Sequence, residues 1–332
     1  MDITGKKILV IGGAGLIGSH VVEELLKEDI EKVVIYDNFC RGTFENLEEA
    51  LKDPRCNIFE IGGDILQTDI LNTAMKDIDG VVHLAALWLL QCYEFPRAAF
   101  DVNIRGTFSV LEACVANKVE RLVYSSSASV YGDAVEEPMT EDHPYNNWTF
   151  YGATKIAGEH MLKAYYQRYG LKGVGLRYMN VYGPRQDYKG TYIAVMMKIL
   201  DNIDKGVSPV VYGDGSQSYD FIYVGDTARA NVCALKSDIP FGFYNVGRGI
   251  KNSVKELTEL ILKITNSDLS IQYEPAGQTF VTNRVGDPTA AERDLGFKWT
   301  VDLEDGLRRL VEWRRSHIKE VEKRRKTAGI KD

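Results

Sequence analysis

The stretch "KKILVIGGAGLIGSHVVEELLKE", residues 6–28, decides the fold. Its apolar run 8–11 predicts a buried strand, and the apolar residues that follow the glycines recur at helical spacing. A glycine-rich turn that joins a strand to a helix is typical of a dinucleotide-binding fold. Gly12 permits the tight turn, Gly15 lets the backbone approach a pyrophosphate, and Gly18 allows the helix to pack closely on the strand. The N-terminus of this helix also offers free N–H groups to an anion.

The same alternation of strand and helix continues outward from this stretch. Short apolar runs at 33–38, 56–64, 80–86 and 121–127 predict further strands, and residues 100–117 predict a helix. Strands with continuous apolar runs between helices indicate a parallel sheet covered on both faces. We therefore expect an α/β fold with a Rossmann-type doubly wound parallel sheet and a smaller C-terminal α/β substrate domain.

The alternation of predicted strands and helices becomes less regular after residue 180. We predict a NAD-binding domain with the catalytic residues over 1–180 and a substrate-binding domain over 181–315, with some crossing of the chain between them. Helical patterns remain at 254–264 and 303–317. The strongly charged tail, 316–332, is expected to be a solvated helix that frays.

Bulk properties exclude several classes of function. The 332 residues carry a formal net charge of -7, so a nucleic-acid partner has no global electrostatic support. Five scattered cysteines without a C-x-x-C pair favour reduced thiols over disulfides or a zinc site. The N-terminal apolar run is too short for a membrane span and lacks the features of a secretory signal. We expect a cytoplasmic protein with no metal and no membrane partner.

Asp37 ends the second predicted strand about 20 residues after the glycines, where its carboxylate can bind the adenosine ribose. It would repel a 2′-phosphate, so we predict NAD; the nearby Arg41 keeps NADP as the less favoured alternative. Asn103 is expected either to cap a helix or to hydrogen-bond the strand that carries the serines. His83 is expected to be buried rather than catalytic. The predicted NAD site comprises Gly12, Gly15, Leu16, Ile17, Gly18, Asp37, Asn38, Asp64, Ile65, Leu84, Ala85, Ala86, Asn103, Tyr151 and Lys155.

The chemical site is predicted from "SSSASVYG", residues 125–132, and "YGATK", residues 151–155. Tyr151 and Lys155 are four residues apart and therefore lie on one face of a helix. A phenol with a pKa near 10 is a poor base at neutral pH. The ammonium of Lys155 and the positive nicotinamide ring of NAD⁺ would both favour its phenolate.

With these motifs the chain resembles the extended short-chain dehydrogenase/reductase family, whose nucleotide-sugar epimerases and dehydratases share the layout. The resemblance runs from residue 7 to about 315 and includes "HLAA" at 83–86, "LRYMNVYGPRQ" at 176–186 and "VYGDGSQSYDFIYVGD" at 211–226. It implies a catalytic set of Ser127, Tyr151 and Lys155, tightly bound NAD, and homodimers joined through a four-helix bundle.

The family's 4,6-dehydratases typically have Thr-Asp-Glu, and its decarboxylases Thr-Ser-Glu, where this chain has Ser127, Ala128 and Ser129. Elimination of water needs one proton taken from carbon and another given to the leaving hydroxyl, and alanine can do neither. The stretch resembles UDP-glucose 4-epimerases instead, so we predict an epimerase. A dehydratase with displaced acids, a simple sugar dehydrogenase and, much less favoured, a non-catalytic NAD sensor remain as alternatives.

The predicted substrate contacts depart from the family pattern. Relatives usually have an arginine where this chain has Tyr219, and a second phosphate arginine near residue 277, where "EPAGQTF" (274–280) has none. Arg185, Arg248 or Arg284 could replace them, and we place Arg185 and Arg248 first. The resemblance implies a diphosphate contact for Asn180, and Ser127 is expected to touch the sugar. Trp88, Leu89 and Leu90 either shape the sugar pocket or pack in the core.

Overall fold

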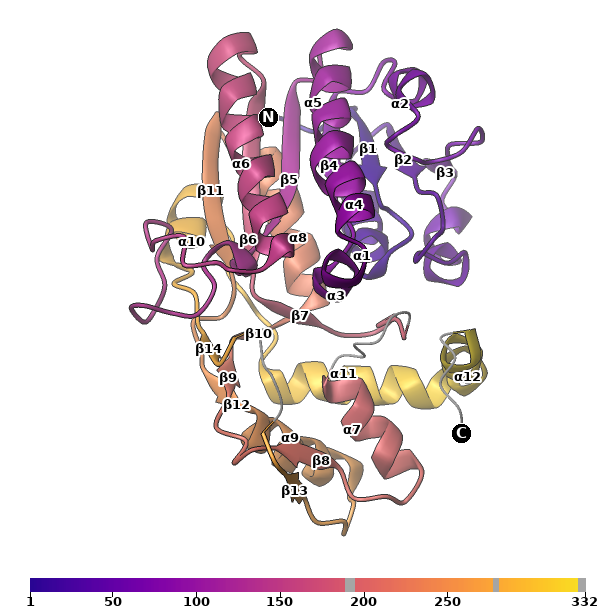
Figure 1. The fold of residues 1–332 in the computed structure, drawn as a ribbon. Helices are drawn as coiled ribbons and strands as arrows, with labels where there is room; N and C mark the ends of the chain where they lie inside the picture. The colour runs from indigo at the N-terminus through magenta and orange to yellow at the C-terminus, as the bar shows by residue number, and fades with distance from the viewer. Residues whose placement is uncertain (189–194, 277–280, 328–332) are drawn as a thin grey trace.

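A computed structural model of the chain describes residues 1–188, 195–276 and 281–327. A parallel sheet flanked by helices forms its upper part in Figure 1, and a smaller part with short strands lies below. The sheet has seven strands in the order β11-β6-β5-β4-β1-β2-β3. Their bounds are β1 Lys7–Ile11, β2 Lys32–Tyr36, β3 Cys56–Ile58, β4 Gly80–His83, β5 Arg121–Ser127, β6 Lys172–Tyr178 and β11 Phe241–Val246.

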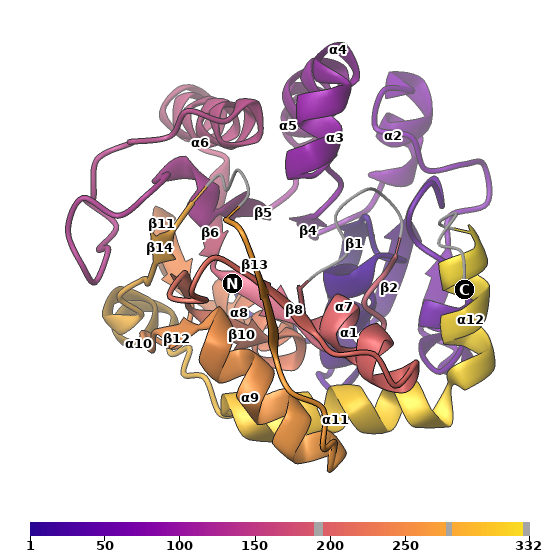
Figure 2. The same ribbon diagram turned by 60° about the horizontal axis from the view of Figure 1, so that its bottom comes forward.

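Helices cover both faces of the sheet (Figure 2). One face carries α2 (Thr68–Ala74), α5 (Thr107–Ala116) and α6 (Phe150–Tyr169), and the other carries α1 (Leu16–Leu26), α8 (Val224–Lys236) and α10 (Thr289–Leu295). Shorter turns connect these layers: η1 Glu45–Leu47, η2 Ala50–Lys52, α3 Leu89–Glu94, α4 Pro96–Ala99, the π-helix η3 Phe100–Gly106 and η4 Ala128–Val130.

The core lies on both sides of the central strands. In β1, Ile8 and Val10 pack with one cluster of buried residues, whereas Leu9 and Ile11 pack with another. Successive side chains of a strand point to opposite faces, so a strand that is apolar throughout requires cover on both sides. The predicted fold class, a doubly wound parallel sheet with a smaller C-terminal part, is confirmed.

The smaller part is built from short paired strands and three helices. Strand β7 (Asn180–Tyr182) pairs with β10 (Phe221–Tyr223), and β8 (Val210–Tyr212) pairs with β13 (Gln272–Glu274). Strand β9 (Ser218–Tyr219) lies between β12 (Asn252–Ser253) and β14 (Asn283–Arg284). The helices are α7 (Val195–Asp204), α9 (Val254–Thr265) and α11 (Leu303–Ser316), so both helices predicted in this region are present.

The charged tail forms a further helix, α12 (Ile318–Thr327), as predicted, and most of its residues are exposed. Val321 and Arg324 are buried in it. The Arg324 guanidinium donates to the side-chain oxygen of Asn46 at 2.6 Å and to the carbonyl of Arg185 at 3.0 Å. These contacts, together with the ion pair between Lys323 and Glu45, dock this helix against the loop after β2. Across the described ranges, no helix is long and apolar enough to span a membrane.

Candidate active site

A cleft of about 1200 Å³ opens at the carboxyl ends of the sheet strands and extends to the smaller part. Ligands of open α/β sheets bind at this edge. Among the predicted residues, the cleft is lined by Gly12, Gly15, Leu16, Ile17, Gly18, Asp37, Asn38, Asp64, Ile65, Leu84, Ala85, Ala86, Ser127, Tyr151, Lys155, Asn180 and Tyr219. Asn103, Arg185 and Arg248 are not among its lining residues.

The glycine loop has the close approaches that a dinucleotide site requires. A Cβ on Gly12, whose φ is +83°, would lie 2.8 Å from the backbone nitrogen of Ala85, and a Cβ on Gly18 would overlap the Gly12 carbonyl oxygen. Gly15 precedes α1 and provides no side-chain cap for its first N–H groups. These donors, with the positive end of the helix dipole, suit a pyrophosphate. The cradle therefore fits NAD.

Asp37 links the glycine loop to the loop after β2. Its carboxylate accepts hydrogen bonds from the backbone N–H groups of Ala14 and Phe39, both at 2.8 Å. Arg41, the basis of the NADP alternative, donates to Asp187 at 3.0 Å from Nε and 2.7 Å from Nη2. It also lies 5.1 Å from the centre of the Trp88 ring. This arginine is thus held across the cleft rather than presented beside Asp37.

Asn103 neither caps a helix nor hydrogen-bonds the strand that carries the serines. It lies inside the π-helix η3, where it caps no helix. Its side-chain oxygen accepts from Leu87 N at 2.7 Å, and its Nδ2 donates to Leu87 O at 2.9 Å and to the Thr154 hydroxyl at 3.1 Å. Both expectations for this residue are wrong. The amide instead joins the segment after β4 to α6, behind the cleft.

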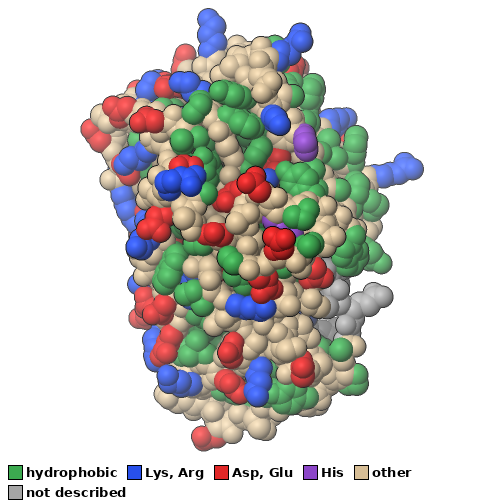
Figure 3. All heavy atoms as spheres, turned by 90° about the vertical axis from the view of Figure 1, so that its left-hand side faces the viewer, with side chains coloured by type: hydrophobic (Ala, Val, Ile, Leu, Met, Phe, Trp, Pro, Cys, Tyr) green, Lys and Arg blue, Asp and Glu red, His purple; other side chains and the backbone are tan. Residues whose placement is uncertain are grey.

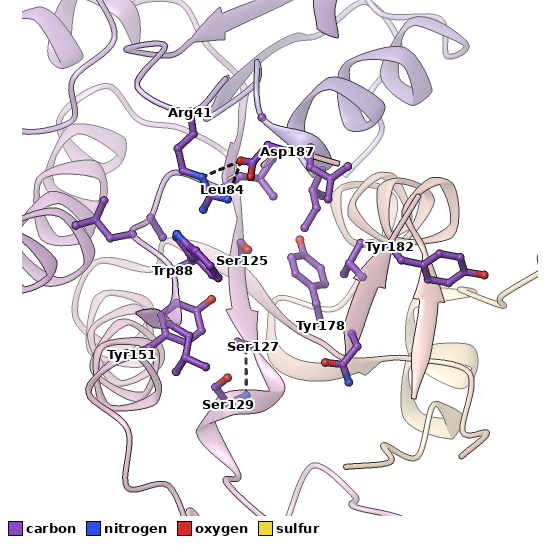
Figure 4. Close-up of a pocket in the computed structure, with 18 of the residues that line it drawn as sticks. Arg41, Leu84, Trp88, Ser125, Ser127, Ser129, Tyr151, Tyr178, Tyr182 and Asp187 are labelled. Carbon is purple, nitrogen blue, oxygen red and sulfur yellow. Dashed lines mark hydrogen bonds and ion pairs between the residues drawn. The ribbon is translucent and has the colours of Figure 1, made fainter. Parts of the chain in front are cut away.

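Ser127 and Tyr151 meet at the end of β5 (Figure 4). Ser127 is the last residue of the strand and caps η4, where its Oγ accepts from Ser129 N at 3.1 Å. Tyr151 lies in the first turn of α6, whose N-cap Thr149 accepts from Gly152 N at 3.1 Å. Burial raises the pKa of the Tyr151 phenol to about 12, whereas its hydrogen bond with Ser127 and the charges of Arg41 and Arg284 lower it.

Lys155 is buried one turn after Tyr151. Its Nζ donates to the Ser125 carbonyl at 2.6 Å and lies 5.7 Å from the centre of the Tyr151 ring. Burial lowers the pKa of this ammonium to about 8. The Cys92 thiol and the negative charge of Glu159 act in the opposite direction and raise the pKa. Lys155 is thus held where a positive charge stabilises the Tyr151 phenolate.

His83 is buried, with Nε2 3.1 Å from the Thr107 hydroxyl. Burial lowers its pKa to about 3, so the imidazole is neutral at physiological pH. The expectation that His83 is a buried residue is confirmed.

Three comparisons with known proteins agree with this geometry. A sequence model of the NAD dependent epimerase/dehydratase family matches residues 8–247. The chain belongs to this family. The match contains the glycine loop, the serines of β5 and the Tyr151–Lys155 pair, and it makes the protein a member of a family of NAD-dependent enzymes.

Similar members of the family carry out more than one reaction. A putative UDP-glucose 4-epimerase of Methanocaldococcus jannaschii is 36% identical, over 93% of this chain and 99% of the relative. A dTDP-glucose 4,6-dehydratase of Actinoplanes is 32% identical, over 94% and 98%. The structure of a UDP-N-acetylglucosamine 4-epimerase from Methanobrevibacter ruminantium, in complex with UDP-N-acetylmuramic acid, is 35% identical over 94% of this chain and 99% of its own, with a TM-score of 0.88.

The two positions after Ser127 differ in their surroundings. Ala128 is buried in the core, whereas Ser129 lines the cleft and its Oγ lies 3.5 Å from Nη1 of Arg284. No carboxylate stands at this turn. The described carboxylates that line the cleft are Asp37, Asp64, Asp187 and Asp201. In Figure 4, Asp187 lies with Arg41 on the far side of Trp88 from Tyr151.

The arginines predicted to hold a diphosphate lie elsewhere. Nη2 of Arg185 pairs with Glu23 on α1. Arg248 is buried, and donates to the Phe221 carbonyl and the Asn252 side chain, both at 2.6 Å. The geometry thus corrects both assignments. Nη2 of Arg185 and the Arg248 guanidinium hold elements of the fold together, whereas the buried Nη1 of Arg185 has no hydrogen-bond partner among the described residues.

Of the three candidate arginines, Arg284 on β14 lines the cleft, which Arg41 and Arg325 also line. Its backbone pairs with that of Tyr219 on β9, so it stands one strand from the position where relatives usually have an arginine. Nη1 and Nη2 make only long contacts, 3.5 Å to Ser129 Oγ and 3.4 Å to Gly132 O, and the buried Nε has no hydrogen-bond partner among the described residues. Burial lowers the pKa of the Arg284 guanidinium to about 10, and it remains charged at neutral pH.

Tyr219 itself donates from its hydroxyl to the Val281 carbonyl at 2.8 Å. Sequence reasoning missed the neighbouring Tyr178 and Met179, which also line the cleft. The only available signal was their place in the motif "LRYMNVYGPRQ" at 176–186. Trp88 and Leu89 line the cleft as well, which favours the sugar-pocket alternative for them.

Proposed function

We propose that the protein is a NAD-dependent 4-epimerase of a nucleotide-linked hexose. The observation that carries this proposal is the turn after β5, which places the Ser127 and Ser129 hydroxyls in the cleft and buries Ala128 where an acid would be needed for elimination. The reaction then requires only a base for the sugar hydroxyl, a cofactor for reversible oxidation, and room for the sugar to turn.

Tyr151 performs the proton transfer. As phenolate it takes the proton of the 4-hydroxyl, directly or through Ser127, and the same phenol returns it after the sugar has turned. NAD, held by the glycine loop and Asp37, would supply the reversible hydride transfer at C4 of the sugar. Lys155 keeps a positive charge beside the phenol and lies where it can hold the nicotinamide ribose.

Arg284 is the proposed diphosphate ligand, with Asn180 beside it. Arg284 lines the cleft, and its charged guanidinium has few hydrogen-bond acceptors among the described residues. The oxygens of a diphosphate would provide acceptors for a bidentate contact with this guanidinium. This replaces the role first assigned to Arg185 and Arg248. The nucleotide and the substituents of the hexose are left unspecified.

Exposed aromatic side chains on neighbouring helices support the proposal of a homodimer. Phe100 on η3 is 51% exposed and Phe108 on α5 is 45% exposed. Phe108 packs edge-on against Tyr165 of α6, so both helices present one apolar face. Hydrophobic side chains gather along the upper right of Figure 3, the side on which α6 lies. Two copies meeting through α5 and α6 would form a four-helix bundle, and Phe108→Asp should then give monomers in light scattering.

The cytoplasmic location remains a prediction of the cysteine pattern. All five thiols are free in the structure, three of them buried.

Solvent isotope incorporation tests the proposed reaction. A dehydratase removes a carbon-bound proton and replaces it from a group that exchanges with water, whereas epimerisation at C4 leaves every carbon-bound hydrogen in place. Nucleotide hexoses turned over in deuterated water should yield 4-epimers without carbon-bound deuterium. Deuterium in the product, with loss of the C4 hydroxyl or of C6 oxygen, would favour the dehydratase alternative that the Actinoplanes relative represents.

A further inference from the structure

Helix α6 carries a third polar residue on the face of Tyr151 and Lys155. Glu159 follows Lys155 by four residues and is 1% exposed. It does not line the cleft, and proton transfer at the sugar has no step for it. A carboxylate this deeply buried requires compensation by hydrogen bonds and an opposite charge.

Both oxygens of Glu159 are fully engaged. Oε1 accepts from the Ser126 hydroxyl at 2.6 Å and from Nε of Arg177 at 2.9 Å. Oε2 accepts from Nη2 of Arg177 at 2.8 Å and from the Tyr145 hydroxyl at 2.9 Å. The pair is a bidentate arginine–carboxylate contact with fixed geometry. It joins α6 to β5, to β6 and to the loop that leads into α6.

Three residues of this helix face each contact one of the three serines at the end of β5. The Tyr151 phenol hydrogen-bonds Ser127, Lys155 bonds the carbonyl of Ser125, and Glu159 bonds the hydroxyl of Ser126. Three helical residues spaced by one turn are thus matched to three consecutive strand residues. A shift or rotation of α6 along β5 would break all three contacts together. The Arg177 pair makes the Glu159 contact the most strongly held of the three.

Stability alone does not account for this arrangement. Replacing a buried ion pair by apolar residues of similar volume is often neutral or stabilising. Gly158 adds a steric reason for precision, because a Cβ there would overlap the hydroxyl of Tyr124. The helix therefore packs directly on the side chain of Tyr124 from β5, next to the point where Glu159 is clamped.

We propose that Glu159, clamped by Arg177, Ser126 and Tyr145, is a positioning residue that holds Tyr151 and Lys155 of α6 in register with the serines of β5. The role rests on the proposed function, because it matters for catalysis only if Tyr151 and Lys155 act on the substrate. The Glu159 carboxylate also raises the pKa of Lys155 against burial, which keeps the ammonium charged beside the phenol. The titratable groups that act on Lys155 and Tyr151 from the surrounding elements are Arg41, His83, Cys92, Tyr124, Glu159, Tyr178 and Arg284.

The test compares Glu159→Gln and the double variant Ser126→Ala, Tyr145→Phe with a matched control, Ser237→Ala. The Ser237 hydroxyl accepts a hydrogen bond at 3.0 Å from Nη1 of the buried Arg121, at the opposite end of β5, so Ser237→Ala removes a similar bond far from the cleft. The double variant removes three hydrogen bonds without leaving an unpaired charge, so it serves if Glu159→Gln does not fold. Each protein is studied as the NAD-bound holoenzyme.

We expect kcat to fall by about 10²-fold in Glu159→Gln with KM and NAD content unchanged, the scale of a misplaced catalytic group. The pKa of Tyr151 is measured by following phenolate absorbance as the pH is raised. The curve of the same variant carrying Tyr151→Phe is subtracted, so that only the signal of Tyr151 remains. This pKa should rise, because a displaced α6 weakens the hydrogen bond with Ser127, which lowers the pKa of the phenol. Ser237→Ala should lower the melting temperature and leave both readouts unchanged.

The positioning role would be overturned if Glu159→Gln had the wild-type kcat and an unchanged Tyr151 pKa. If Glu159→Gln does not fold, the same result in the double variant would overturn it. The phenol titration needs no substrate. If no nucleotide sugar is turned over by the wild type, the proposed function fails, while the titration still decides whether Glu159 positions the Tyr151–Lys155 pair.

Discussion

Arg284→Ala tests how the chain binds a diphosphate without an arginine at Tyr219. The substitution removes a guanidinium whose only described contacts, at 3.5 and 3.4 Å, are weak. Little stability should therefore be lost, and the cost should fall on ligand binding. A hydrogen bond to a charged group contributes about 1.5–3 kcal/mol. Because 1.4 kcal/mol corresponds to a factor of ten, the Kd of a nucleoside diphosphate should rise roughly 10- to 10²-fold.

Calorimetric titration of the NAD-bound protein with UDP, and with the other nucleoside diphosphates, measures this Kd directly. Arg185→Ala is the matched control, since it removes an arginine that pairs with Glu23 outside the cleft. It should leave the Kd unchanged. An Arg284→Ala protein that binds the diphosphate as tightly as the wild type, or an equal loss in Arg185→Ala, would refute the assignment of Arg284.

Three further predictions follow from the cofactor, the base and a buried imidazole. Holoenzyme with Tyr151→Phe should keep NAD but lose at least about 10²-fold in turnover, and near-normal turnover would remove the phenol from the mechanism. Because Asp37 would repel a 2′-phosphate, calorimetry should show tighter binding of NAD than of NADP; an equal affinity would contradict this. His83 has a folded pKa of about 3 against 6.5 in the unfolded chain. The unfolded state thus binds its proton first, and the free energy of unfolding should fall as pH drops from 6.5 toward 3. His83→Asn should flatten that slope in thermal melts, and an unchanged slope would argue against a buried neutral imidazole.

Local patterns were sufficient to predict the fold and the cofactor side of the cleft. Residues 8–18 carry strand, turn and helix signals in one short segment, and strands with unbroken apolar runs can only lie inside a covered sheet. Because parallel strands end at one edge, residues that close predicted strands, such as Asp37, Asp64 and Ser127, were expected to meet there. The structure places all three on one cleft.

The substrate side depends on contacts that no local pattern contains. The sequence analysis placed Arg185 and Arg248 ahead of Arg284 as the arginines nearest to family motifs, and the sequence offered no basis for choosing Arg284. Its entry into the cleft follows from the pairing of β14 with β9, 65 residues earlier in the chain at Tyr219. The Arg248 guanidinium instead donates to the Phe221 carbonyl, and the Asn103 amide bonds Leu87 and Thr154, contacts that no local sequence pattern indicates.

The most direct test of the central claim is the product formed from a panel of nucleotide sugars, analysed by mass spectrometry and NMR. The account predicts a product of the same mass as its substrate, inverted at C4 alone, with no net change in the NAD content of the protein. A product lighter by water or carbon dioxide, or stoichiometric release of NADH, would contradict it.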